Sequence, residues 1–77
     1  MDVAIAFGKV IRELRVKAGL TQEQLGFEAD LRRTFISILE LGQQQPTLTT
    51  IMKLAFALGT TASAIIATVE EMIRTSN

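Results

Sequence analysis

Residues 21–46 constrain the fold of this chain most, because two helix starts lie within them on either side of a short turn. Thr21 and Gln24 have the spacing of a capping box, in which each side chain bonds the backbone N–H of the other residue. This pattern predicts a helix from Thr21 through about Glu28. Asp30 then suits a left-handed turn residue, since its short side chain can hydrogen-bond locally.

A second helix is predicted from about Arg33 to Leu41. Gly42 suits the left-handed residue that ends a helix, and Pro46 prevents any continuation while fixing the backbone for the next helix. Two helices joined by such a turn form a helix-turn-helix, the unit that places its second helix in a DNA major groove.

Apolar residues at spacings of three and four predict three more helices. The apolar positions are Phe7, Val10, Ile11, Leu14 and Ala18 in the first helix, Leu48, Ile51, Leu54, Ala55 and Leu58 in the fourth, and Ala62, Ile65, Ile66, Val69, Met72 and Ile73 in the fifth. Thr47 caps the fourth helix and Thr60 or Thr61 caps the fifth. No strand pattern or linker interrupts this series, so we expect an all-α fold of five helices and a single domain over residues 1–77.

Several segments from Gly19 onward, taken in their order along the chain, resemble a known family of domains. They are Gly19-Leu20-Thr21-Gln22-Glu23-Gln24-Leu25, Leu31-Arg32-Arg33-Thr34-Phe35-Ile36-Ser37, Leu39-Glu40, Gly42, Pro46 and Leu54-Ala55-Phe56-Ala57-Leu58-Gly59. They look like the helix-turn-helix domains of phage repressors of the XRE (Cro/CI) type, over about Gly8 to Ile66. The resemblance implies a compact lambda-repressor-like DNA-binding domain.

Composition excludes several classes of function. The chain has no cysteine and no histidine, so the common general bases and metal ligands are missing, and we expect neither an enzyme nor a metal or cofactor site. No apolar run approaches the ~20 residues that cross a bilayer. Asp2 and Lys9 do not fit a secretory signal. We therefore expect a cytoplasmic protein without a membrane association, and without room for a ligand-sensing domain.

The formal net charge of zero argues against a nucleic-acid partner, but the distribution of charge weakens this argument. Most lysines and arginines lie in the first half of the chain, whereas Glu70 and Glu71 lie near its end. A basic face can therefore coexist with a net charge of zero, and double-stranded DNA stays the expected partner.

The resemblance implies that the start of the second helix of the motif reads bases. The expected base-reading residues are Arg32, Arg33, Thr34, Ser37 and Ile38. A guanidinium such as that of Arg33 can bind guanine O6 and N7 with two bonds. Arg33 also opposes the helix dipole, which favours an anionic partner, although a solvated helix start is the plainer alternative.

Phosphate contacts are expected from the surrounding helix ends and loops. The expected residues are Arg12, Thr21, Gln22, Gln43, Gln44, Gln45 and Thr47. The resemblance implies the contact of Gln22, whereas capping alone explains Thr47. Relatives often carry Lys or Arg where this chain has three glutamines, so we expect few ionic phosphate contacts. The family pattern also implies that Arg15 pairs with Glu40 as a structural ion pair.

Phe35, Ile38 and Leu41 are spaced to form an apolar row, which we expect to be exposed because Ile36 and Leu39 serve the core. Such a row could contact thymine methyl groups or bind a protein partner. A different rotation of the helix is the third possibility.

The apolar stripe of the last helix, at about 62–75, extends beyond what a four-helix core needs. We expect a homodimer through this extension, with an interface made by Ile65, Ile66, Val69, Met72 and Ile73. The alternative is that the stripe packs back onto the first helix near Val3 and Phe7.

These patterns together predict a sequence-specific DNA-binding transcriptional regulator. As a homodimer it would bind a palindromic operator with half-sites about 34 Å apart. The alternative is a protein-interaction module of the same fold, such as an antitoxin that neutralises a toxin.

Overall fold

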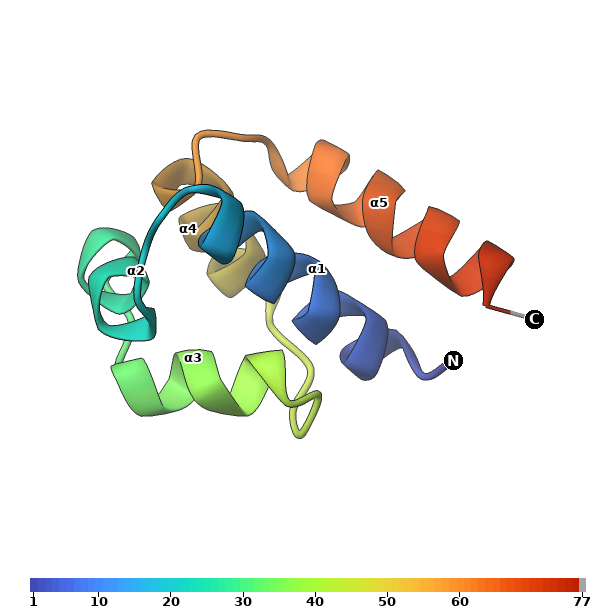
Figure 1. Cartoon of the computed structure of the whole chain (residues 1–77), viewed down its shortest axis with the longest axis horizontal. Coiled ribbons are helices and arrows are strands. Elements are labelled where there is room, and N and C mark those ends of the chain that lie inside the picture. The colour runs from blue at the N-terminus through green and yellow to red at the C-terminus, as the bar shows by residue number, and fades with distance from the viewer. Residues whose placement is uncertain (77) are drawn as a thin grey trace.

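Five helices and the loops between them make up the computed structural model, which describes residues 1–76 (Figure 1). The helices are α1 (Val3–Lys17), α2 (Gln22–Ala29), α3 (Arg33–Glu40), α4 (Leu48–Ala57) and α5 (Ala62–Thr75). Residues 1–76 contain no strand, so the predicted all-α fold is confirmed.

Side chains cap the N-termini of four of these helices. The caps are Asp2 for α1, Thr21 for α2, Thr47 for α4 and Thr61 for α5. The predicted capping box is present: the Gln24 N–H donates to Thr21 Oγ1 at 3.0 Å, and the Thr21 N–H donates to Gln24 Oε1 at 2.8 Å. Arg32 precedes α3 and makes no side-chain capping bond, so α3 starts without this support.

Left-handed residues end α2 and follow α3, as the sequence predicts. Asp30 has a φ of 56° and Gly42 has a φ of 72°. The helix α3 ends at Glu40, and Leu41 is its C-cap. These local conformations fix the direction in which the chain enters and leaves α3.

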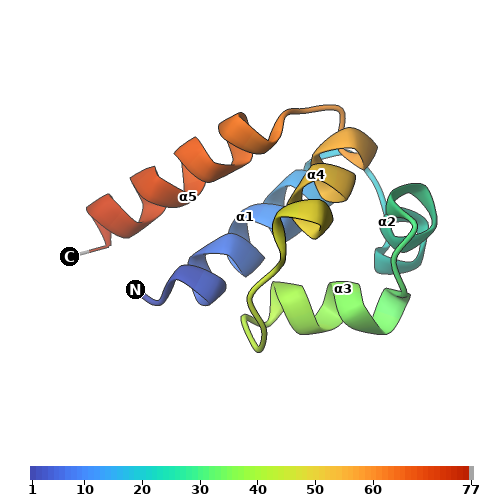
Figure 2. The ribbon, with the colours of Figure 1, turned by 180° about the vertical axis from the view of Figure 1, so that it is seen from behind.

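The helix α1 lies at the centre of the fold, between α3 and α5, while α2 packs on α3 and α4 (Figures 1 and 2). Every helix contributes to one core. Its largest fully buried side chains are Val10, Ile11, Leu25, Ile36, Leu39, Leu54 and Ile65.

A glycine lets α1 approach α3 closely. A Cβ on Gly8 would lie 2.3 Å from the carbonyl oxygen of Leu39 and 2.7 Å from that of Glu40. No side chain fits at such distances, because both neighbours are backbone atoms of a packed helix. Gly8 thus sets how deeply the C-terminal end of α3 sits on α1.

The packing of α5 corrects the predicted dimer interface in part, because Ile66 stays exposed while the other four residues are covered or partly covered within the single chain. Ile65 and Val69 are 1% and 3% exposed within the single chain, and Met72 and Ile73 pack half-buried against the core. The alternative, packing back onto α1, is what the structure shows. The reason is that α3 covers only part of the apolar surface of α1, and α5 covers the rest.

The expected apolar row on α3 is also wrong. Phe35 packs against the core and Ile38 is half-buried, while Leu41 is 64% exposed. Phe35 precedes the buried Leu39 by four residues, so both lie on one side of the helix. The rotation of α3 therefore differs from the expected one.

No single helix among the described residues is long and apolar enough to cross a bilayer. The helices α4 and α5 meet the length and composition criteria only as a pair, and the pair is bent by 104°. Both helices pack on the core described above.

We predict that Ile65→Ala lowers the free energy of unfolding by about 2–5 kcal/mol, because it removes fully buried methyl groups and leaves a cavity. Ile66→Ala, one residue further on, is the matched control. Ile66 is 38% exposed, and its change is expected to cost less than about 1 kcal/mol. Urea denaturation of dilute protein measures both values, and equal losses would contradict the burial of Ile65.

Candidate nucleic-acid interface

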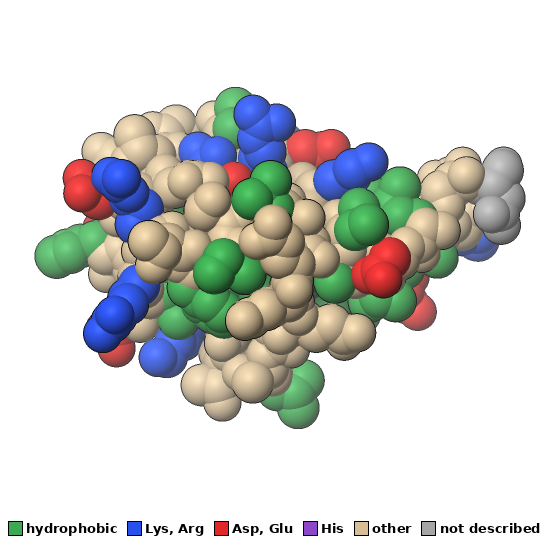
Figure 3. Space-filling model, turned by 90° about the horizontal axis from the view of Figure 1, so that it is seen from below, with side chains coloured by type: hydrophobic (Ala, Val, Ile, Leu, Met, Phe, Trp, Pro, Cys, Tyr) green, Lys and Arg blue, Asp and Glu red, His purple; other side chains and the backbone are tan. Residues whose placement is uncertain are grey.

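The first turn of α3 lies on the surface. Arg32, Arg33 and Thr34 are exposed, and Ser37 one turn later is half-buried. Figure 3 looks onto the side of the molecule that carries α3 and shows Lys and Arg side chains at its left and along its upper edge, with acidic side chains beside several of them. The predicted base-reading residues thus lie together on and just before α3, with Ser37 and Ile38 half-buried.

The positive end of α3 is open. The first backbone N–H groups of any helix have no intrahelical partner. Here Arg32 supplies no capping side chain, and the first turn holds no acidic residue. Arg33 adds a full positive charge at the same end, which is unfavourable for the helix alone. An anion placed at this end would remove both disadvantages.

A weak ion pair holds Arg33 beside α2. Its Nη1 lies 3.8 Å from Glu23 Oε2, and both side chains are largely exposed. Exposed pairs of this kind contribute between zero and about 1 kcal/mol. Arg33 can therefore leave Glu23 for a stronger acceptor at little cost.

Arg15 and Glu40 form the predicted ion pair, with side chains only 12% and 4% exposed. Arg15 Nε donates to Glu40 Oε2 at 2.6 Å and Nη2 donates to Oε1 at 3.0 Å, while Nη1 donates to the Leu20 carbonyl at 2.9 Å. The hydrogen bond with Glu40 raises the pKa of Arg15, against the opposing effect of burial. Arg15 thus ties α1 to α3 and is not free to contact DNA.

Gln22 makes a contact that sequence reasoning missed. It begins α2, is half-buried, and its Nε2 donates to Glu40 Oε1 at 3.1 Å. Gln22 also lines a shallow pocket at the junction of α2 and α3. The other residues of this pocket are Arg15, Leu20, Thr21, Glu23 and Arg33. No local signal in the sequence links Gln22 to a residue eighteen positions away.

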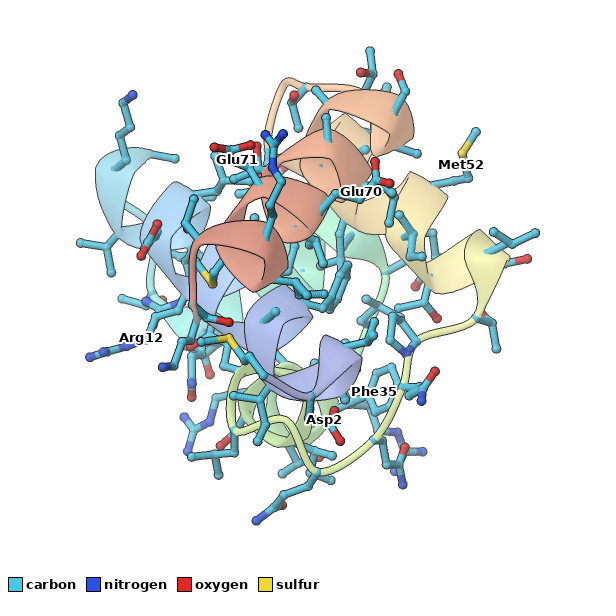
Figure 4. All side chains as sticks on the ribbon, turned by 90° about the vertical axis from the view of Figure 1, so that its right-hand side faces the viewer. Asp2, Arg12, Phe35, Met52, Glu70 and Glu71 are labelled. Carbon is cyan, nitrogen blue, oxygen red and sulfur yellow. The ribbon has the colours of Figure 1, made fainter. Side chains whose placement is uncertain are left out.

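The other residues expected to contact phosphate fall into two groups, those whose side chains cap no helix and the two threonines that cap one. Gln43, Gln44 and Gln45 are exposed in the loop after α3. Figure 4 shows Arg12 pointing outward from α1, on the side of the molecule opposite Phe35.

The hydroxyls of Thr21 and Thr47 both act as caps. Thr47 Oγ1 accepts from the Thr50 N–H and donates to Thr50 Oγ1, both at 3.1 Å. Thr21 Oγ1 accepts from the Gln24 N–H. The Thr47 hydroxyl thus already accepts one hydrogen bond and donates another, so capping explains this residue without a DNA contact. The Thr21 hydroxyl accepts a bond and still has its proton to donate.

Exposed apolar side chains on α4 were not identified from the sequence. Phe56 is 84% exposed and Met52 is 62% exposed, and the two residues are four positions apart on one side of α4. Leu48, one of the apolar positions whose spacing predicted this helix, is also largely exposed. The signal in the sequence was the spacing of Met52 and Phe56 outside the buried stripe.

Comparison with known families matches residues 11–65 to the family model described as Helix-turn-helix. The chain belongs to this family. Control protein C.BamHI of Bacillus amyloliquefaciens is 41% identical to this helix-turn-helix protein over 59 residues, which are 75% of this chain and 73% of that protein. Control protein C.MunI of Mycoplasma sp is 34% identical over 71 residues, 91% of this chain and 96% of its own length.

A solved structure agrees with this assignment. The restriction-modification controller protein C.AhdI from Aeromonas hydrophila superimposes with a TM-score of 0.78 at 39% identity, covering 80% of this chain and 94% of that chain. Together the comparisons make this helix-turn-helix protein a DNA-binding transcriptional regulator and not an enzyme. The resemblance to XRE-type domains that the sequence suggested is thereby confirmed.

We predict that Arg15→Met lowers the free energy of unfolding by about 3–5 kcal/mol, because Glu40 would stay buried without its partner. Arg74→Met is the control. Arg74 forms an exposed i,i+3 ion pair with Glu71, and its change is expected to stay within about 0.5 kcal/mol. Chemical denaturation followed by circular dichroism measures both variants, and a cost below 1 kcal/mol for Arg15→Met would show that the pair is not the structural tie described above.

Proposed function

We propose that this helix-turn-helix protein is a homodimer that binds a palindromic operator in the cytoplasm, with α3 of each subunit in the major groove. The observation that carries the proposal is the exposed and uncapped start of α3, where Arg32 and Arg33 add positive charge to a positive helix end. A helix start of this kind is unfavourable in isolation and becomes favourable against a polyanion.

Sequence would be read from the exposed side of α3. Arg33 suits two hydrogen bonds to a guanine, and Thr34 and Ser37 can donate to or accept from either kind of base pair. Arg32 lies one residue before the helix and can contact a base or the backbone. The half-buried Ile38 keeps enough surface to touch a thymine methyl group.

Phosphates would be held on both sides of this helix. Gln22 and Thr21 lie at the N-terminus of α2, where the helix dipole and the backbone N–H groups outside the capping box favour an anion. Arg12 and the exposed glutamines after α3 supply the remaining donors. Because these glutamines are neutral, hydrogen bonds would contribute more to the binding than ionic contacts do.

A palindromic operator requires a two-fold dimer, and we assign its interface to exposed residues near the junction of α4 and α5. This dimer surface consists of Met52 and Phe56 on α4 and Ile66 on α5. Beside it lies a shallow pocket lined by Met52, Ala55, Phe56, Thr60, Thr61, Ala62 and Ser63. Ile66 follows Ala62 and Ser63 by one helical turn and lies on their side of α5.

Such a surface suits contact with a second copy of itself. A two-fold interface uses the same surface of both subunits, so a side chain that projects from one subunit can enter a hollow of the other, and the same contact occurs a second time with the subunits exchanged. Phe56 projects beside a hollow of its own chain, so two copies can each insert this ring into the pocket of the partner. Similarity to C.BamHI and C.AhdI further supports a role as the controller of a restriction-modification system.

The alternative of an antitoxin-like interaction module was expected to use either the row on α3 or the last helix. Since Phe35 packs on the core and Ile38 is half-buried, Leu41 alone of that row is exposed. A DNA-binding role for α3 is therefore preferred.

Arg33→Ala is expected to cost about 1–3 kcal/mol of operator binding and to relax the choice of base at one position of each half-site, because a bidentate guanine contact is lost. Operators are first selected from random duplexes, and both proteins are then titrated against single-base variants in mobility-shift assays. Arg74→Ala, an exposed arginine on α5, should bind as the wild type does.

Two outcomes would contradict this reading. No enrichment of any duplex in the selection would overturn the DNA-binding proposal. An equal loss of affinity for all sequences, with a salt slope reduced by about one, would make Arg33 a phosphate contact instead.

Phe56→Asp is expected to raise the dissociation constant of the dimer more than tenfold, because a buried ring is replaced by an unpaired carboxylate. Its helix content should stay unchanged, since Phe56 is 84% exposed in the single chain. Phe27→Asp changes an equally exposed ring on α2 and should leave the dimer intact. Sedimentation at micromolar concentration measures all three proteins, and a monomeric wild type would refute the proposed assembly.

A further inference from the structure

The carboxylate of Glu40 joins three helices. Lying at the end of α3, it accepts two hydrogen bonds from Arg15 of α1 and a third from Gln22 of α2. Its side chain is 4% exposed, so water cannot replace these donors freely. The ion pair of Arg15 and Glu40 connects α1 to α3, whereas the bond from Gln22 connects α2 to α3.

This third bond fixes which way the Gln22 amide faces. A carboxylate only accepts hydrogen bonds, so the NH2 group of Gln22 must face Glu40 and the carbonyl oxygen must face elsewhere. One of the two N–H bonds is used at 3.1 Å. The other makes no hydrogen bond with any residue that the structure describes, and it remains available. An amide without such a neighbour could turn over and present its oxygen, which repels a phosphate.

The orientation matters because of where Gln22 lies. It is the first residue of α2 and lines the shallow pocket that also contains Arg33, the first residue of α3. An anion at the mouth of this pocket would lie between the N-terminal ends of both helices. The side chain of Gln22 is half-buried there and is held at its far end.

We propose that Glu40 is a positioning residue for DNA binding, which orients the Gln22 amide so that its second N–H donates to a backbone phosphate. This inference rests on the proposed function. Because Glu40 is also the last residue of α3, the same carboxylate fixes the phosphate contact of α2 relative to the helix that reads bases. The Gln22 side chain then loses little rotamer freedom when DNA binds.

The free protein tests the orientation without DNA. In NMR spectra of the 15N-labelled wild type, one Gln22 side-chain amide proton should shift downfield and exchange slowly with water, since it is bonded to a buried carboxylate. Glu40→Gln should abolish both features, whereas Glu70→Gln, which removes an exposed charge on α5, should retain them. Ordinary, fast-exchanging Gln22 protons in the wild type would overturn the inference.

A double-mutant cycle then tests the effect on operator binding. Gln22→Met removes the donor while keeping the length of the side chain, and should weaken binding about tenfold, as expected for a lost bond to a charged group. Glu40→Gln should weaken binding about fivefold in the wild type and less than twofold in the Gln22→Met background. A purely structural role of Glu40 predicts the same factor in both backgrounds and would overturn the inference.

A second variant covers the case in which Glu40→Gln does not fold. Gln22→Asn keeps the amide but shortens the side chain by one methylene, so that it cannot reach Glu40 and a phosphate together. It should weaken binding about as much as Gln22→Met, and wild-type affinity would overturn the inference. If the wild type binds no selected duplex, the proposed function fails; if it binds and the cycle shows no coupling, this inference alone fails.

Discussion

The buried ion pair between Arg15 and Glu40 is the interaction on which the position of α3 depends. Removing two charges from water is costly, and the cost is offset only when geometry is good and the remaining hydrogen-bonding groups are satisfied. Here both carboxylate oxygens are used, and Leu20 accepts the further N–H of Arg15. Gly8 complements the pair, since its missing side chain lets the end of α3 rest on α1. Such a rigid support suits the proposed reading of bases by α3, because hydrogen bonds to base edges tolerate little displacement.

The sequence predicted well those features that depend on neighbouring residues. The capping box at Thr21, the left-handed turn at Asp30 and the helix end at Gly42 follow from local chemistry, and the structure has all of them. The ion pair of Arg15 with Glu40 was found through the resemblance to a family, and not from the spacing of the two residues.

The features that depend on how helices pack were harder to predict. Periodicity showed that α5 has an apolar stripe, but not that α1 of the same chain would cover Ile65 and Val69. The rotation of α3 was misjudged because the position of Phe35 fits two apolar faces of the helix, one shared with Ile38 and Leu41 and one shared with Leu39. The bond from Gln22 to Glu40 connects residues far apart in the sequence, and only the packed structure brings them together.

The packing of α1 between α3 and α5 has a consequence for how the protein is made. The helix at one end of the described chain is covered by the helix at the other end, so many core contacts join residues that are distant in sequence. Such contacts form late, because a long loop must close before they stabilise anything. During translation α1 has its cover only once α5 has left the ribosome. The packing that supports α3 is thus complete only in chains synthesised through α5, and incomplete chains would remain targets for proteases.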